Sequence, residues 1–502
     1  MNRWFSLGLA SLALVAIAGA PSVADTDKVD ASHGRIKLMT HVIEGAPPQE
    51  ALPAGALGGQ TIFLNHCVGG CTVRPGMDDA SSDTSSIAKQ VTTIAEYTFQ
   101  AGEWANILQC VKEVYSPFNV HVTDVRPAGP PYEEIIVGGT PDDLMLPVGV
   151  GGIGSLQPGC APNPKGVSFA FTSAIDVFAG EDGGSRVFGM CWIIAQETAH
   201  NFGLDHEYEF VEDGKSACND PMTYRADCGG QKFFRNKIAK AGSTALCGTN
   251  ADPANVCLCG GNQNSHGKMI DNFGPGTSLI PPPSAVITLP AANGALGASV
   301  IASIGSKRGV ERAEVYLNGY LWRTLPGAAF GPQGQVNPTA YQFTLPTEIP
   351  NSIYDIVVKG YDDLGILGTS ATLVATKGPT GGCATADTCL KGQNCANGRC
   401  FWDPPAGEIG DACTFAQFCK SGICQGTADQ SICTQDCIPG SADSCPNPDL
   451  SCIESTPGHG ICFFTPDSGG CCSVGDSSNA WIPGGLGALV FGFLVIRPRR
   501  RR

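Results

Sequence analysis

Short apolar runs alternate with stretches of helical length over residues 57–280. Residues 104–114 and 186–200 have the length and composition of helices, and the second stretch is apolar enough to be buried. Four runs rich in branched and aromatic residues are bounded by turn residues and have the length of strands: 62–64, 118–122, 135–137 and 167–171. This succession predicts a multidomain chain that begins with an α/β (α+β) domain.

The pattern changes to short alternating runs over residues 281–378. Three prolines at 281–283 predict a stiff linker, and the pair Asn318 and Gly319 is typical of a turn between strands. Four runs predict strands: 286–289, 314–317, 341–345 and 354–358. An all-β sandwich of about 100 residues is therefore expected, similar to the Ig-like domains appended to bacterial exoenzymes. Another small β-domain is the alternative.

Cysteine divides the chain in a second way. Of 24 cysteines, ten lie between Cys67 and Cys259 and fourteen between Cys383 and Cys472. Residues 379–470 carry too few large apolar side chains for a core of their own, so disulfides are expected to hold a Cys-rich stalk together. Zinc ribbons are the alternative, but the module has only His459 and no clean pair of Cys-x-x-Cys knuckles.

The beginning of the chain has the pattern of a secretory signal. Arg3 precedes an apolar run, and small residues end at Ala24, so residues 1–24 predict a signal peptide that is removed. A membrane-anchored first helix is the alternative, although the apolar run is short for a span. Residues 25–56 have little periodicity and contain no Cys, which favours a propeptide or linker.

The end of the chain has the pattern of a membrane anchor. An apolar transmembrane segment is predicted at residues 481–496, and the Arg-rich end that follows should stay cytoplasmic. The paired Cys471 and Cys472, the apolar segment and the Arg cluster resemble the MYXO-CTERM class of sorting tags, which covers residues 471–502 here. That resemblance implies export and display at the cell surface, or secretion after processing, with the membrane as a partner.

Charge narrows the possible partners. The formal net charge of −15 disfavours nonspecific binding to phosphate backbones, so no nucleic-acid partner is expected.

The helix at residues 186–200 carries the candidate chemistry. Gln196 and His200 lie one turn apart, so both side chains can reach one metal ion. Gly203 allows the chain to turn sharply at the end of the helix. This turn brings His206 back toward Gln196 and His200 as a third ligand. Glu197, next to a ligand position, is placed to act as a general base on water.

These residues resemble the metzincin zinc proteases. The run from Gln196 to His206 overlays the pattern His-Glu-x-x-His-x-x-Gly-x-x-His at every defining position except the first, and Met222, sixteen residues after His206, resembles the Met-turn of that family. The resemblance, over residues 60–265, implies a catalytic or oxyanion-stabilising role for Tyr224. It also implies that the strand at residues 167–171 borders the cleft and pairs with extended substrate. A core helix with two incidental histidines is the alternative.

Gln196 is the departure from this pattern. An amide oxygen is a weaker zinc ligand than an imidazole nitrogen, so either Gln196 coordinates through its oxygen or the domain binds no metal. His66 or His121 is a possible replacement ligand.

The leading hypothesis is an exported, surface-anchored zinc metalloendopeptidase with protein or peptide substrates. Zn2+ is the expected cofactor, held by His200, His206 and Gln196, and Glu197 is the expected base. The competing hypothesis is a pseudoprotease that serves as a surface adhesion or binding protein.

Overall fold

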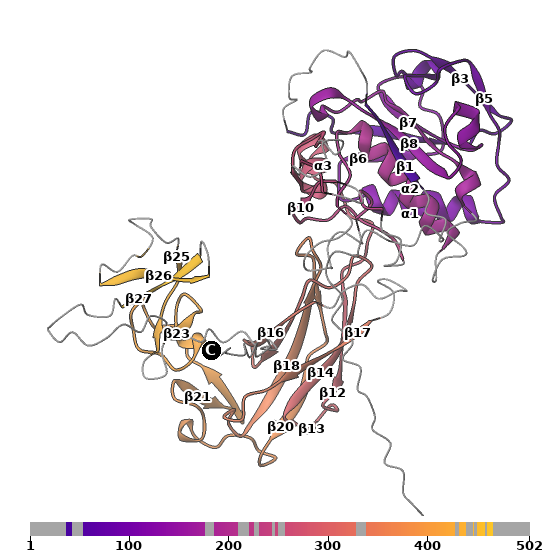
Figure 1. The fold of residues 1–502 in the computed structure, drawn as a ribbon. Helices are drawn as coiled ribbons and strands as arrows, with labels where there is room; N and C mark the ends of the chain where they lie inside the picture. The colour runs from indigo at the N-terminus through magenta and orange to yellow at the C-terminus, as the bar shows by residue number, and fades with distance from the viewer. Residues whose placement is uncertain are drawn as a thin grey trace, which may run out of the picture. The chain divides into compact units, whose positions relative to one another are not determined.

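The computed structural model divides the chain into two compact units, Met1–Leu279 and Ile280–Arg502, each considered by itself (Figure 1). The structure describes residues 37–42, 54–175, 185–208, 220–224, 230–242, 246–248, 257–327, 338–426, 431–437, 445, 449–456 and 459–464. The predicted signal peptide and the predicted tail at residues 471–502 lie outside these residues. Within them, no helix has the length and apolarity that a membrane span requires.

A six-stranded sheet forms the centre of the first unit (Figure 1). In spatial order, its strands are β1 (Lys37–Val42), β8 (Val150–Leu156), β9 (Val167–Ala170), β7 (Tyr132–Val137), β2 (Gln60–Asn65) and β6 (Val120–Thr123). All neighbours are parallel except β8 and β9, so β1 and β8 run opposite to the other four strands. The predicted strands within β2, β6, β7 and β9 are confirmed.

Helices complete the first unit. Helix α1 (Glu103–Tyr115) and helix α2 (Arg186–Asn201) are joined by the disulfide Cys110–Cys191, and α2 packs against β8 and β9. Both helices are close to their predicted ranges. Besides short 3-10 helices, the described part of this unit contains helix α3 (Ser265–Phe273) and the short strands β3 (Cys71–Pro75), β4 (Thr84–Ser85), β5 (Thr92–Ile94), β10 (Ala239–Lys240) and β11 (Asn262–Gln263).

Two glycines bring β8 close to α2. A Cβ on Gly152 would lie 2.7 Å from Cγ of Glu197, and a Cβ on Gly154 would lie 2.3 Å from the backbone oxygen of Glu197 and 2.9 Å from Cβ of His200. Side chains at these two positions would therefore push the strand off the helix. Strand β8 is not predicted by the sequence pattern, because most of its central residues, Gly-Gly-Ile-Gly-Ser, lack the branched and aromatic side chains typical of strands.

The expected place of the strand at residues 167–171 is wrong in this fold. That strand, β9, is interior and pairs with β7 on one side and β8 on the other. Strand β8 instead lies toward the edge, where it pairs with β1. The sequence also did not predict β1, which lies within the 25–56 segment expected to be a propeptide or linker.

A β-sandwich begins the second unit, as predicted. One sheet contains β12 (Ser284–Leu289), β14 (Ser299–Gly305) and β17 (Thr339–Thr344). The other contains β13 (Gly294–Ala295), β20 (Leu373–Lys377), β18 (Ser352–Tyr361), β15 (Arg312–Leu317) and β16 (Tyr320–Pro326), with β19 (Leu367–Thr369) beside β18. Buried residues alternate along β14 and β18, and both sheets contribute them to one apolar core.

Disulfides hold the Cys-rich module, as predicted, and the structure shows that they cross in pairs. Three successive pairs of bonds form: Cys383–Cys395 with Cys389–Cys400, Cys413–Cys424 with Cys419–Cys433, and Cys437–Cys452 with Cys445–Cys462. The strands between them are short: β21 (Gln393–Ala396), β22 (Arg399–Trp402), β23 (Cys424–Gly426), β24 (Ser431–Cys433), β25 (Asp436–Cys437), β26 (Leu450–Thr456) and β27 (His459–Phe464).

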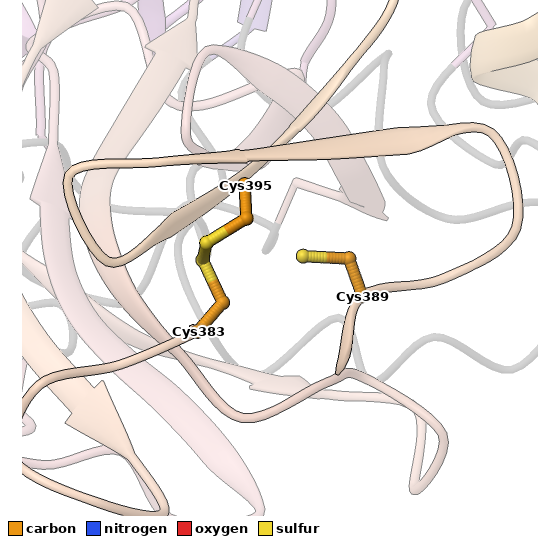
Figure 2. Close-up of side chains that lie close together, drawn as sticks. All are labelled: Cys383, Cys389 and Cys395. Atoms are coloured by element: carbon orange, nitrogen blue, oxygen red, sulfur yellow. A yellow bond between two sulfur atoms is a disulfide. The ribbon is translucent and has the colours of Figure 1, made fainter. Parts of the chain in front are cut away.

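The crossed pairs also bring three sulfur atoms together in each part of the module. Figure 2 shows Cys383 bonded to Cys395 with the sulfur of Cys389 nearby, and the three sulfurs lie within 4.8 Å of one another. Cys389 is bonded to Cys400. Disulfide sulfur has no thiolate to offer a metal, so these clusters are crosslinks rather than zinc ribbons.

Stability of the first unit should depend on the glycine at position 154. We expect Gly154→Ala to lower the unfolding free energy by about 1–3 kcal/mol, because its Cβ would overlap the backbone of α2. Calorimetry on the oxidised protein measures this. Gly129→Ala is the matched control, since a Cβ there meets no described atom within 4 Å. Equal unfolding temperatures for the two variants would contradict the close packing of β8 on α2.

Stability should also depend on pH through Glu134 in β7. Burial raises the pKa of this carboxyl to about 7, although Arg126 and Asn65 oppose the rise. The folded state thus holds the proton more tightly than the unfolded chain. This contribution favours folding fully below pH 4.5 and is lost as the pH rises through about 7. Glu134→Gln should therefore stabilise the protein at pH 8, by at most roughly 3 kcal/mol, and change little at pH 4. Denaturant unfolding at both pH values tests this, and an equal effect at both would contradict it.

Candidate metal centre

Helix α2 carries three candidate residues that are fully buried. Gln196, Glu197 and His200 have no exposed surface. The helix begins at a Ser185 cap, whose hydroxyl accepts a hydrogen bond from the backbone NH of Phe188. On the α1 side, the hydroxyl of Tyr115 contacts both the carbonyl of Ala195 and the hydroxyl of Thr198. The helix is therefore fixed along the turns that carry the candidate residues.

Gly203 makes the turn that brings His206 back to His200. Its φ is +82°, and a Cβ there would lie 2.1 Å from the carbonyl oxygen of Cys160, so the turn requires glycine. Nε2 of His206 then lies 3.1 Å from Nε2 of His200. The turn therefore places the two imidazole rings next to each other.

The His200 ring is oriented by the chain that follows it. Nδ1 lies 2.7 Å from the carbonyl oxygen of Leu204. A carbonyl only accepts, so Nδ1 carries the proton and Nε2 presents a lone pair. Burial lowers the pKa of His200, and burial with the neighbouring His200 lowers the pKa of His206 further. Both rings are thus neutral at physiological pH, which is the form that binds metal.

Two further side chains have polar atoms buried without partners. Among the described residues, neither amide atom of Gln196 and neither carboxylate oxygen of Glu197 has a hydrogen-bond partner of ordinary geometry. Burial raises the pKa of Glu197 well above its usual value, and the backbone amide of Gly154 offsets this only in part. Burying an amide or a carboxylate without a hydrogen-bond partner is unfavourable in free energy, so these two side chains indicate a missing partner.

The predicted Met-turn lies beneath α2 and is held on several sides. Nε1 of Trp192 donates to the carbonyl of Pro221 at 2.8 Å, and the side chain of Asp220 accepts from the NH of Met222 at 2.9 Å. The NH of Glu207 donates to the carbonyl of Met222, also at 2.9 Å. The turn is thus tied both to α2 and to the residue after His206.

Lys232 closes the far side of this turn. Its Nζ donates to the carbonyl of Thr223 at 2.8 Å and lies 3.6 Å from the centre of the Trp192 ring. The residue is 8% exposed, so the ammonium exchanges most of its water for these two contacts. Trp192 and Lys232 are not predicted from the sequence, because neither residue belongs to the motif.

Tyr224 leaves this turn and reaches His206. Its hydroxyl oxygen lies 3.2 Å from Nε2 of His206, and the two ring centres are 4.6 Å apart. A phenol at this position can stabilise negative charge that develops near the histidines. The structure therefore brings together His200, His206 and Tyr224, with Met222 buried in the turn below.

Two neutral imidazoles and a buried amide fit zinc, which prefers nitrogen and oxygen ligands. Within the described part of the chain, no third His, Cys, Asp or Glu places a ligand atom within 4.8 Å of the histidine pair. His66 stacks on Trp104, and His121 is exposed in β6, so neither replaces the missing ligand. The unpartnered Oε1 of Gln196, one helical turn from His200, is the candidate for that place.

Comparisons with known proteins do not identify a family. No protein-family model and no curated protein matches the chain. A structure of the CbhA fibronectin(III)-like modules of Clostridium thermocellum matches with a TM-score of 0.14 and 16% identity, over 21% of this chain and 51% of that chain. Two crystal structures of OgpA from Akkermansia muciniphila match with a TM-score of 0.18 and 10% and 11% identity, over 67% of this chain and 98% and 99% of theirs. Likenesses this low carry no argument about fold or function.

The contacts of Lys232 predict a stabilising role beneath the site. Lys232→Met keeps the apolar stem but leaves the carbonyl of Thr223 without its charged donor. We expect a loss of about 1–3 kcal/mol in unfolding free energy, measured by denaturant titration. Lys89→Met, at an exposed position, should change it by less than about 0.5 kcal/mol. Equal stability of the two variants would contradict this role.

Proposed function

We propose that this chain is a zinc-dependent metalloendopeptidase that acts outside the cytoplasm. The observation that carries the proposal is the approach of Nε2 of His200 to Nε2 of His206, on the helix that also carries the buried Glu197, whose carboxylate has no hydrogen-bond partner of ordinary geometry among the described residues. His200, His206 and the amide oxygen of Gln196 would hold the ion. The chemistry that zinc supplies when bound is polarisation of a carbonyl and a lowered pKa for water.

Glu197 is the proposed general base. A nearby cation favours the ionised carboxylate and so opposes the effect of burial on its pKa. In that state Glu197 takes a proton from the attacking water and passes it to the leaving amine of the cleaved peptide bond. Tyr224 donates a hydrogen bond to the oxygen of the carbonyl as negative charge develops on it. His200 keeps its orientation because Leu204 holds Nδ1.

The place of action is supported by the crosslinks. The described residues contain ten disulfides, four in the first unit and six in the Cys-rich module. Disulfides at this density are typical of exported proteins. The apolar and Arg-rich sequence at residues 481–502 supports attachment to the outer face of the envelope, with the sandwich and the Cys-rich module as spacer.

A second candidate function is a catalytically impaired surface binding protein. The observation that favours it is Gln196, because an amide oxygen binds zinc more weakly than imidazole and no third His, Cys, Asp or Glu among the described residues completes the site. The two candidates differ in whether the native protein holds zinc.

Two measurements distinguish the peptidase from the binding protein: metal analysis and casein cleavage. Both use the oxidised protein without its signal peptide. We expect about one zinc per chain in the wild type and in Glu197→Ala, with cleavage reduced on the order of 10²–10⁴-fold in that variant. His206→Ala should lose the zinc. Gln196→His should bind zinc on the order of tenfold more tightly, because imidazole replaces an amide.

Folded wild-type protein that holds no zinc and cleaves nothing, while Gln196→His gains zinc, would overturn the peptidase proposal in favour of the binding protein. Cleavage that a chelator leaves unchanged would also contradict it. Circular dichroism on each variant shows whether the loss of metal reflects the site or unfolding.

A further inference from the structure

The main chain just before His206 is held by a side chain from a distant segment. Oε1 of Gln263 accepts a hydrogen bond from the backbone NH of Asp205 at 2.8 Å, and Nε2 of Gln263 donates to the carbonyl oxygen of Asp205, also at 2.8 Å. Among the described residues, neither of these groups of Asp205 bonds to another main-chain group. Asp205 therefore depends on Gln263 for the partners that secondary structure supplies elsewhere.

The side chain of Asp205 connects this contact to His206. Its Oδ1 accepts a hydrogen bond from the NH of His206 at 2.8 Å, and its Oδ2 accepts one from the NH of Leu258 at 3.2 Å. Asp205 is only 6% exposed, so both its main-chain and its side-chain groups are paired inside the protein. Because the imidazole of His206 is attached to the next residue, the main chain of Asp205 determines where that imidazole begins.

Gln263 is itself placed by regular structure. It is the last residue of β11 and lies opposite Ala239 in β10. The next residue, Asn264, caps the N-terminus of α3 with its side chain. A side chain that starts between a paired strand and a capped helix has a fixed backbone, so ordering its amide costs only side-chain entropy. Gln263 is therefore preorganised to hold Asp205.

The chain on the other side of His206 is held by different groups. The carbonyl oxygen of His206 accepts from the NH of Gly242 at 3.1 Å, and the NH of Glu207 donates to the carbonyl of Met222 at 2.9 Å. Neither contact involves Gln263. Loss of the Gln263 amide should therefore let the imidazole shift while the turn around it stays folded.

We propose that Gln263 is a positioning residue for the candidate metal centre: by pairing with the main chain of Asp205, it keeps Nε2 of His206 beside Nε2 of His200. The role in metal binding rests on the proposed zinc peptidase function, whereas the effect on the His206 ring does not. Residues that orient a metal ligand from behind typically contribute about 10–100-fold to metal affinity. At this position the contribution requires a donor and an acceptor on one side chain, which the amide of glutamine supplies.

The test compares the zinc affinity of Gln263→Met with that of the wild type, in oxidised protein without its signal peptide. Methionine has nearly the length of glutamine but lacks the amide donor and the strong acceptor. We expect zinc to bind about tenfold or more weakly, measured by competition with a metal-binding dye, in protein whose circular dichroism is unchanged. Asn262→Met, at an exposed position of the same strand, is the matched control and should bind zinc as the wild type does. A purely structural role would lower the unfolding temperature of Gln263→Met without changing its zinc affinity, and that result would overturn the proposal.

NMR of the metal-free protein with labelled histidine separates this inference from the proposed function. The ring resonances of His206 should shift or broaden in Gln263→Met and stay in place in Asn262→Met, because only the first variant releases Asp205. A displaced His206 resonance, in a protein whose wild type holds no zinc, would overturn the peptidase function and leave the placement of the ring by Gln263 standing. An unchanged resonance would overturn the inference even where zinc binds.

Gln263→Glu keeps the test decisive where Gln263→Met fails to fold. Glutamate has the shape of glutamine and retains an acceptor for the NH of Asp205, but its carboxylate cannot donate to the carbonyl of Asp205. The same displacement of the His206 resonance is expected. Its absence in folded Gln263→Glu would overturn the proposal.

Discussion

The architecture of the first unit depends on the direct contact of a strand with the helix that carries the candidate site. Gly152 and Gly154 let the backbone of β8 lie on α2 at the level of Glu197 and His200, where no larger residue fits. This contact excludes water from one side of both side chains. It also sets the distance between the helix and the sheet edge, so the glycines determine the surroundings of the candidate residues as well as the packing.

Burial around α2 has two opposite outcomes. At its C-terminal end, Asn201 donates to Glu133 in β7 and contacts the hydroxyl of Ser155, which in turn contacts Asp78. The polar groups there largely pair with one another and fasten the helix to the sheet. One turn earlier, Gln196 and Glu197 are equally buried but have no such partners among the described residues. This contrast supports the proposed ligand at the turn of Gln196 and Glu197, although Oε2 of Glu133 also lacks a hydrogen-bond partner among the described residues.

The sequence predicts the parts of this protein that follow simple periodicities or fixed spacings. The α2 helix, the return of His206 after Gly203, and the crosslinked module all follow from local patterns. Strand β8 could not be predicted this way, because its glycines are selected by the helix surface opposite and not by strand propensity. Lys232 and Trp192 meet only through the tertiary fold, and β1 pairs with a strand more than 100 residues away. Contacts of that range leave no trace in local periodicity.

The crossing of the disulfides in the Cys-rich module has a consequence for its response to proteolysis. Because Cys383–Cys395 and Cys389–Cys400 overlap along the chain, a backbone cut anywhere between Cys383 and Cys400 leaves the two fragments joined by at least one bond. The same holds for the pairs that span Cys413 to Cys433 and Cys437 to Cys462. A single backbone cut inside any of these three loops therefore leaves the two sides of the cut covalently linked.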